Sequence, residues 1–300
     1  MTFPYLTETE DLTDAVRATA DGSFIRLTDG VCHYQIHPHP LPLSQTERGI
    51  VVLIHGFSVP YFIWDPTFEF LAQSGYRVLR YDLFGRGYSD RPRVRYDIHL
   101  FVRQLKDLLD ALKIQEPIHL VGLSMGGPIS AAFVNQFPEQ VKSHILIDPA
   151  GARSISFSWA LKAAKLPLVA ELALGLLGGE GLVKSIASDF FSSDLVEQFQ
   201  ANYRVQMRYK GFIRAILSTI RNGMVDSFLE TYQQVGRLNK PTLLFWGRAD
   251  TTVPFEWSRD LLSALPQTEF HPVENCGHIP HYERPETVNP LLLAFLGKHS

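Results

Sequence analysis

The stretch His119-Leu120-Val121-Gly122-Leu123-Ser124-Met125-Gly126-Gly127 decides how the rest of this chain is interpreted. Its first residues favour a strand, and residues 129–134 after it favour a helix. A Gly-x-Ser-x-Gly between a strand and a helix is typical of a nucleophile elbow, a turn so sharp that side chains beside the serine would meet neighbouring backbone. The pattern therefore predicts that Gly122 and Gly126 make room for the turn and that Ser124 presents its hydroxyl as a nucleophile.

A serine hydroxyl needs a base to become reactive near neutral pH, and the base needs an acid to orient it. In this kind of site the chain order is serine, acid, histidine. Asp250 follows the apolar strand expected at Thr242–Gly247, and His278 follows a second strand expected at Thr268–Val273. We therefore predict Ser124 as nucleophile, His278 as general base and Asp250 as the orienting acid.

Five motifs stand in a familiar order: His55-Gly56-Phe57, Asp82 to Asp90, the elbow, Gly247-Arg248-Ala249-Asp250, and Cys276-Gly277-His278. They span most of the chain, which resembles the α/β-hydrolase superfamily in its cap-bearing serine-hydrolase branch, of the carboxylesterase or monoacylglycerol-lipase type. The resemblance implies an α/β fold with a mostly parallel, doubly wound sheet. It further implies a core at residues 1–152 and 238–300, with an α-helical cap inserted at residues 153–237.

Two of these assignments have competitors. Asp148 follows the strand after the elbow helix, where some members of the superfamily carry their acid. Asp250 is favoured because Gly-x-x-Asp after the later strand is the commoner arrangement, and Asp148 would then hold the start of the cap by hydrogen bonds. His281 is the nearest rival of His278, whereas Asp82 in its glycine-rich turn is expected to be structural.

The resemblance also implies an oxyanion hole made by the backbone N–H groups of Met125 and Phe57. The side chains of Phe57, Met125 and Trp159 are predicted to contact substrate. His55 is expected to support its own loop by hydrogen bonding.

The composition is that of an ordinary globular protein, with 45% hydrophobic and 20% charged residues and a formal net charge of −3. No basic stripe or phosphate-binding glycine loop occurs, so we expect no nucleic-acid partner.

His33, His37 and His39 are expected at a loop or strand surface and not as metal ligands. Cys32 and Cys276 are predicted to be free thiols, and with no secretory signal evident the expected location is cytoplasmic.

The expected cap lacks strand patterns from about residue 155 to residue 237. Its first part is unusually apolar, but charged residues interrupt it before a membrane span could form. Much of this apolar surface would serve helix packing, and the remainder is predicted to line an acyl tunnel or to touch a lipid interface transiently. Glycines at positions 175, 178, 179 and 181 would permit a mobile lid.

The sequence therefore predicts a serine esterase that cleaves carboxylic esters with apolar acyl groups through an acyl-enzyme at Ser124. No metal or organic cofactor is implied, the expected partner is a small apolar ester, and the oligomeric state stays open. One alternative is a carbon–carbon bond hydrolase of meta-cleavage products. The usual Asn before the nucleophile and the usual His-Gly-Gly loop of such enzymes are replaced here at Leu123 and at Phe57-Ser58. A non-catalytic binding protein on the same scaffold is a further alternative.

Overall fold

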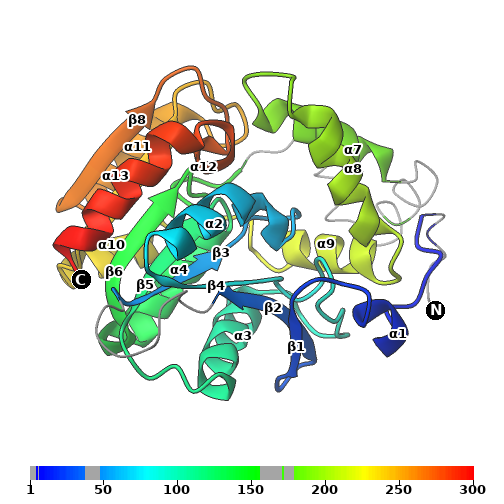
Figure 1. Cartoon of the computed structure of the whole chain (residues 1–300). Coiled ribbons are helices and arrows are strands. Elements are labelled where there is room, and N and C mark those ends of the chain that lie inside the picture. Colours follow the sequence, from blue (N-terminus) through cyan, green and yellow to red (C-terminus); the bar gives the residue numbers. More distant parts are fainter. Residues whose placement is uncertain (1–4, 6, 38–47, 156–170, 172–178) are drawn as a thin grey trace.

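The computed structural model describes residues 5, 7–37, 48–155, 171 and 179–300. Its centre is an eight-stranded sheet in the order β1-β2-β4-β3-β5-β6-β7-β8 (Figure 1). β1 pairs antiparallel with β2 and β2 antiparallel with β4, and every later pairing is parallel. The predicted fold class is confirmed. The strands are β1 Ser23–Arg26, β2 Val31–His37, β3 Ile50–Ile54, β4 Arg77–Tyr81, β5 Ile118–Leu123, β6 Val141–Ile147, β7 Thr242–Gly247 and β8 Thr268–Val273.

Helices cover both faces of the sheet because its central strands are apolar on both sides. In β3, Val51 and Leu53 belong to one buried cluster, with side chains of α2 Asp65–Gln73 and α13 Pro285–Lys298. Ile50, Val52 and Ile54 of the same strand belong to the other cluster, with α3 Ile98–Ala111 and α4 Gly126–Gln136. This alternation follows from the two-residue period of a strand. The remaining helices of the sheet layers are α10 Leu229–Arg237, α11 Ser258–Ala264 and α12 Pro280–Glu283.

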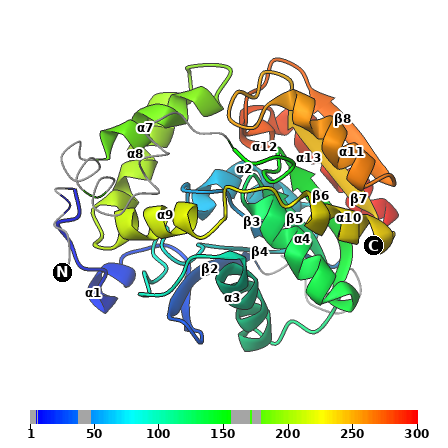
Figure 2. The same cartoon turned by 180° about the vertical axis from the view of Figure 1, so that it is seen from behind.

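The chain between β6 and β7 leaves the sheet and returns to the sheet layers at α10. Its described part contains α7 Glu180–Ser185, the 3-10 helix η3 Ile186–Asp189, α8 Val196–Met207, α9 Phe212–Arg221 and α10. Figures 1 and 2 show α7, α8 and α9 lying together outside the layers formed by the sheet and its covering helices. The short N-terminal helix α1 Asp14–Arg17 and the 3-10 helices η1 Tyr61–Trp64, η2 Pro138–Gln140 and η4 Phe255–Trp257 complete the described elements.

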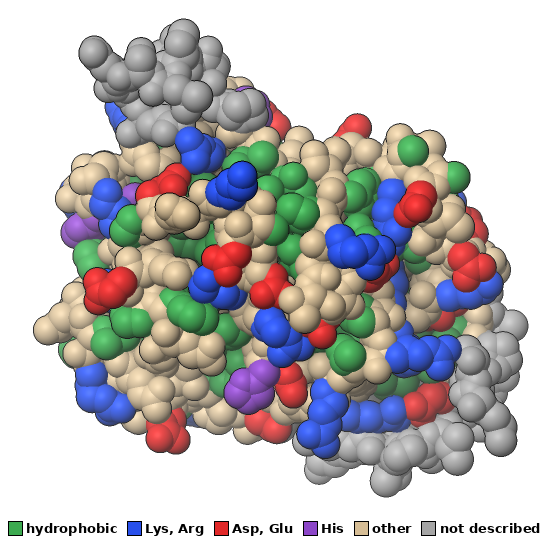
Figure 3. Space-filling model, turned by 90° about the horizontal axis from the view of Figure 1, so that it is seen from below, with side chains coloured by type: hydrophobic (Ala, Val, Ile, Leu, Met, Phe, Trp, Pro, Cys, Tyr) green, Lys and Arg blue, Asp and Glu red, His purple; other side chains and the backbone are tan. Residues whose placement is uncertain are grey.

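Two surface properties follow from the described residues. None of their helices combines the length and the hydropathy needed to cross a bilayer. On the face in Figure 3, lysine and arginine side chains are intermixed with aspartate and glutamate, so this face forms no continuous basic surface.

One local expectation is wrong. His33 was expected at a surface, but it lies buried in β2 with its Nδ1 2.7 Å from Asp82 Oδ2. Asp82 has the structural part predicted for it, because it also accepts hydrogen bonds from the backbone N–H groups of Tyr61 and Tyr88. Burial raises the pKa of Asp82, but the bond to His33 and the neighbouring charges and donors outweigh that effect and lower it.

Candidate active site

Ser124 occupies the turn between β5 and α4 and has a φ of 52°, a left-handed conformation that is strained for a serine. A Cβ added to Gly122 would lie 2.3 Å from the carbonyl oxygen of Gly126, and one added to Gly126 would lie 2.4 Å from that of Ile54. Only glycine fits at either position. The predicted elbow geometry is therefore present, with Ser124 at its tip.

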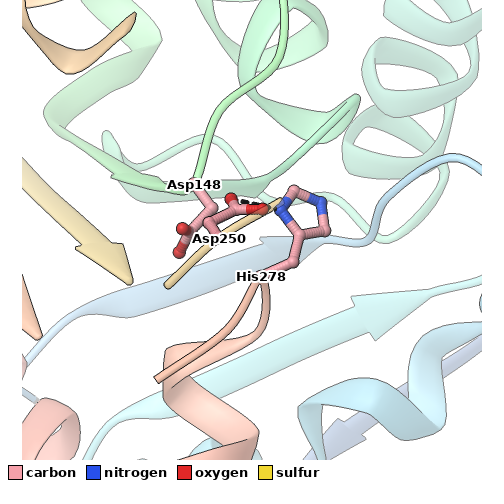
Figure 4. Close-up of side chains that lie close together, drawn as sticks. All are labelled: Asp148, Asp250 and His278. Atoms are coloured by element: carbon pink, nitrogen blue, oxygen red, sulfur yellow. Dashed lines mark hydrogen bonds and ion pairs between the residues drawn. The ribbon is translucent and has the colours of Figure 1, made fainter. Parts of the chain in front are cut away.

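His278 and Asp250 come together from loops that follow β8 and β7. His278 Nδ1 lies 2.7 Å from Asp250 Oδ2, as the dashed line in Figure 4 marks. The other oxygen of Asp250 accepts hydrogen bonds from the backbone N–H groups of Thr252 and Val253, at 2.8 and 2.9 Å. Asp250 is thus held by its own loop through Oδ1, and its Oδ2 orients the imidazole. His278 and Ser124 line the same cavity, so the predicted base and the predicted nucleophile face the same space.

Asp148, the rival acid, is close to this pair but bonds elsewhere. Its Oδ1 accepts a hydrogen bond from the N–H of Gly247 at 2.9 Å. Its Oδ2 is buried and has no hydrogen-bond partner among the residues that the structure describes. Burial and the neighbouring Asp250 raise the pKa of Asp148 well above its usual value. The expected hydrogen bonds to the start of the cap are therefore not what holds Asp148, which instead supports the turn after β7.

The described contacts of His281 are with a backbone carbonyl and an aromatic ring, and not with a triad residue. His281 Nε2 lies 3.1 Å from the carbonyl oxygen of Ile63, and its ring packs 4.2 Å from that of Trp64. Burial lowers the pKa of His281 to about 3, so it stays neutral in this packing. His55 Nδ1 lies 2.9 Å from the carbonyl oxygen of Gly56, and His55 Nε2 accepts a hydrogen bond from the N–H of Leu83 at 2.9 Å. His55 therefore bonds its own loop.

The two predicted oxyanion donors flank Ser124. Within the described part of the chain, neither the N–H of Phe57 nor that of Met125 has a hydrogen-bond partner, so both can serve an oxyanion. The carbonyl of Phe57 accepts a 2.8 Å hydrogen bond from Arg86, whose side chain is fully buried and also donates to Thr219 of α9. Arg86 thereby fixes the Phe57 peptide and ties it to the expected cap.

Two cavities meet at Ser124. Cavity A, about 320 Å³, has an apolar wall of Val59, Ile63, Leu182 and Ile220 and contains Asp189 and His278. Cavity B, about 420 Å³, is lined by Met125, Ala150, Ile155, Met224, Val225 and Thr251. Phe57, Ser124, Ser188 and Thr252 line both. Phe57 and Met125 therefore stand where substrate contact was predicted, whereas Trp159 lies outside the described residues.

Two further residues connect the segment between β6 and β7 to the triad, and neither was predicted from the sequence. Glu283 accepts hydrogen bonds from the N–H groups of Phe191 and Ser192 through one oxygen and from that of Gly277 through the other, at 2.8 to 2.9 Å. Asp189 accepts a 2.7 Å bond from the His278 N–H through its carbonyl. For Glu283 the signal was its position shortly after His278. For Asp189 the sequence contains no such signal, because the contact forms only when η3 packs against the loop that carries His278.

The charge of the site sets the pH at which His278 can act. Burial lowers the pKa of His278, but the Asp250 charge, their hydrogen bond and the Asp189 charge outweigh burial and raise it above 6.5. A general base must be neutral, so reactivity falls as the pH drops through this raised pKa. We expect the rate constant for labelling Ser124 with a fluorophosphonate to show an acid limb whose midpoint lies above pH 6.5. A midpoint below 6.5 would contradict the described surroundings of the imidazole.

Fold and site together define a class: a hydrolase with an elbow serine, a histidine and an aspartate at one edge of a mostly parallel sheet. The chain belongs to the α/β-hydrolase fold family, whose model matches residues 49–285. It is 28% identical over 308 residues to a 2-hydroxy-6-oxononadienedioate/2-hydroxy-6-oxononatrienedioate hydrolase of Paraburkholderia phymatum, covering 96% of this chain and 100% of the relative. A Klebsiella pneumoniae relative of the same name is 29% identical, covering 93% and 96% of the two chains.

Solved structures agree on the fold. An enol-lactonase from Burkholderia xenovorans superposes with a TM-score of 0.75 at 22% identity, covering 91% of this chain and 99% of the other. A meta-cleavage product hydrolase from Pseudomonas fluorescens gives 0.74 at 23% identity, covering 93% and 98%.

These relatives correct the predicted activity. The ester hydrolase of the carboxylesterase or lipase type was the main prediction, and it is wrong, because the similar curated proteins are named 2-hydroxy-6-oxononadienedioate/2-hydroxy-6-oxononatrienedioate hydrolases, which matches the alternative. The physical reason for the error is that both reactions use the same serine triad and differ in the substrate cavity. Leu123 and Phe57 differ from the residues that are usual in the alternative class. In the structure Leu123 is an almost fully buried residue of β5, and Phe57 lines both cavities.

Proposed function

We propose that this protein hydrolyses a carbon–carbon bond beside the ketone of a meta-cleavage product, a 2-hydroxy-6-oxodienoate. The observation that carries the proposal is the similarity of nearly the whole chain to hydrolases named for 2-hydroxy-6-oxononadienedioate. Such a compound contains no ester or amide, so water can divide it only at a bond between carbons. The two cavities beside Ser124 support the proposal, because they leave room for the two halves that flank a scissile bond.

The residues at the junction of the cavities suit this chemistry. Ser124 Oγ would attack the ketone carbon while His278 takes its proton and the N–H groups of Phe57 and Met125 hold the oxyanion. Cleavage requires the 2-oxo tautomer of the substrate, in which the proton of the 2-hydroxyl has moved to C5. The bond between C5 and C6 then breaks, and its electron pair passes through the conjugated double bond to the 2-oxo oxygen of the leaving half. His278 returns the proton to that half. Water, activated by the same imidazole, releases the acyl half as a carboxylic acid, so that one water is consumed.

The test is hydrolysis of 6-alkyl and 6-phenyl 2-hydroxy-6-oxohexadienoates, followed by loss of the absorbance of the conjugated dienolate. We expect turnover by the wild type and a fall of at least about 10³-fold in Ser124→Ala, because the nucleophile is absent. Circular dichroism provides the folding control. Labelling of wild-type Ser124 by a fluorophosphonate without any turnover of these compounds would overturn the carbon–carbon assignment, and absence of both would favour the non-catalytic alternative.

A further inference from the structure

Asp189 places a carboxyl group in the substrate cavity from the cap side. Within the described residues it is the one acidic side chain that lines either cavity, and neither cavity is lined there by lysine or arginine. Asp189 ends η3, and it is half-buried in cavity A beside His278. A negative charge at this position faces whatever enters cavity A.

The contacts of Asp189 fix its position. Burial raises the pKa of its carboxyl group, and the nearby His278 and the hydrogen bond from Thr252 offset part of that rise. Thr252 Oγ1 donates to Asp189 Oδ1 at 2.6 Å, and Thr251 Oγ1 donates to the carbonyl of the preceding Ser188 at 3.2 Å. The backbone N–H of His278 donates to the Asp189 carbonyl. These three bonds dock η3 on the loops that carry Asp250 and His278. The carboxylate is therefore a fixed part of the wall and not a surface group that can swing away.

The two cavities determine how a substrate must lie. A scissile bond held at Ser124 has one half of the molecule on each side, and the halves extend into cavities A and B. A substrate with a single carboxylate can place it in cavity B, which is lined by no acidic side chain among the described residues. A substrate with a carboxylate on each half must place one of them beside Asp189, where two like charges repel each other.

We propose that Asp189 determines specificity by restricting the enzyme to substrates in which only one of the two halves flanking the scissile bond carries a negative charge. This inference rests on the proposed function for the identity of the reaction. It goes beyond the curated relatives, whose named substrates are dicarboxylates. The preferred meta-cleavage product of this enzyme is therefore a monocarboxylate whose ketone substituent is uncharged.

The test uses fluorophosphonates that label Ser124, because labelling needs only the serine and its base. Each probe has two arms on phosphorus, with a carboxylate at the end of one arm or of both, in a series of arm lengths. We expect the wild type to react at least about tenfold faster with the single-carboxylate probe, the effect of one nearby like charge. Asp189→Asn should bring the ratio of the two rates close to one.

The control is Asp194→Asn, which removes an exposed cap carboxylate that lines neither cavity. Its ratio should equal that of the wild type. Asp189→Ser is the second variant if Asp189→Asn does not fold. Equal rates for the two probes in the wild type would overturn the inference whatever the variants do, and so would an unchanged ratio in folded Asp189→Asn.

The same variants then test the substrates. We expect the kcat/KM ratio of a 6-alkyl monocarboxylate to the matched dicarboxylate to fall about tenfold in Asp189→Asn. If the probes discriminate but neither compound is hydrolysed, the proposed reaction fails while the charge selection by Asp189 stands. If both compounds are hydrolysed equally well by the wild type, the reaction stands and the selection by Asp189 is refuted.

Discussion

Asp250→Asn should lower kcat by about 10³- to 10⁴-fold with little loss of stability. The oxygen that accepts from Thr252 and Val253 can be kept by the amide, so the loop geometry survives. The other position then presents an NH₂ group to His278 Nδ1, 2.7 Å away, where the imidazole must donate. The ring is forced into the tautomer that carries its proton on Nε2, which cannot accept the Ser124 proton. Single-turnover kinetics on a hydrolysed substrate, or the Ser124 labelling rate, measures the effect.

Asp148→Asn is the matched comparison, because it makes the same chemical change at a neighbouring buried carboxyl. Asp148 accepts from the Gly247 N–H, which an amide oxygen can also do, and its raised pKa makes the neutral amide a close substitute. We expect less than about a tenfold loss of kcat, since no contact with His278 is changed. The reverse ranking of the two variants would move the acid of the triad to the end of β6.

Gly126→Ala should lower the free energy of unfolding by about 3 kcal/mol and abolish labelling of Ser124. The added methyl would lie 2.4 Å from the carbonyl oxygen of Ile54 and 2.9 Å from that of His55, and backbone cannot yield as a flexible side chain can. Relief requires the elbow to move away from β3, which displaces both the nucleophile and the loop of Phe57. Urea unfolding gives the stability, and fluorophosphonate labelling gives the state of the site.

Gly297→Ala is the control for this substitution. Gly297 lies near the end of α13, and no atom of the described residues lies within 4 Å of an added Cβ. Alanine there should leave labelling unchanged and raise the stability by up to about 1 kcal/mol, because it favours the helix. A Gly126→Ala protein as stable and as reactive as the Gly297→Ala protein would refute the close-packed elbow.

The positions that the sequence located best are those whose chemistry is local. Ser124 was located because a strand, two glycines and a helix within a few residues produce the turn by themselves. The free thiols of Cys32 and Cys276 were also predicted correctly. The failures concern groups whose surroundings come from distant segments. His33 is buried because Asp82 and Tyr61 close over it, and no pattern in its own strand indicates that.

The predicted activity failed for a related reason. An apolar cap suggested an acyl tunnel, but most of the apolar stretch lies outside the described residues, at positions 156–170 and 172–178. The described walls combine apolar side chains with hydroxyls and one carboxylate. Substrate choice depends on these walls, and their composition is set by which cap residues reach the cavity.

The sequence by itself determined the sheet architecture, the elbow and the order of the three predicted triad residues, because strand patterns and turn chemistry act over a few neighbouring residues. Only the tertiary structure decided that Asp250 and not Asp148 contacts His278, and that Asp189 from η3 stands in cavity A. Both results depend on where side chains from separate loops meet. Packing determines those meetings through hydrogen bonds between segments that are far apart in the chain.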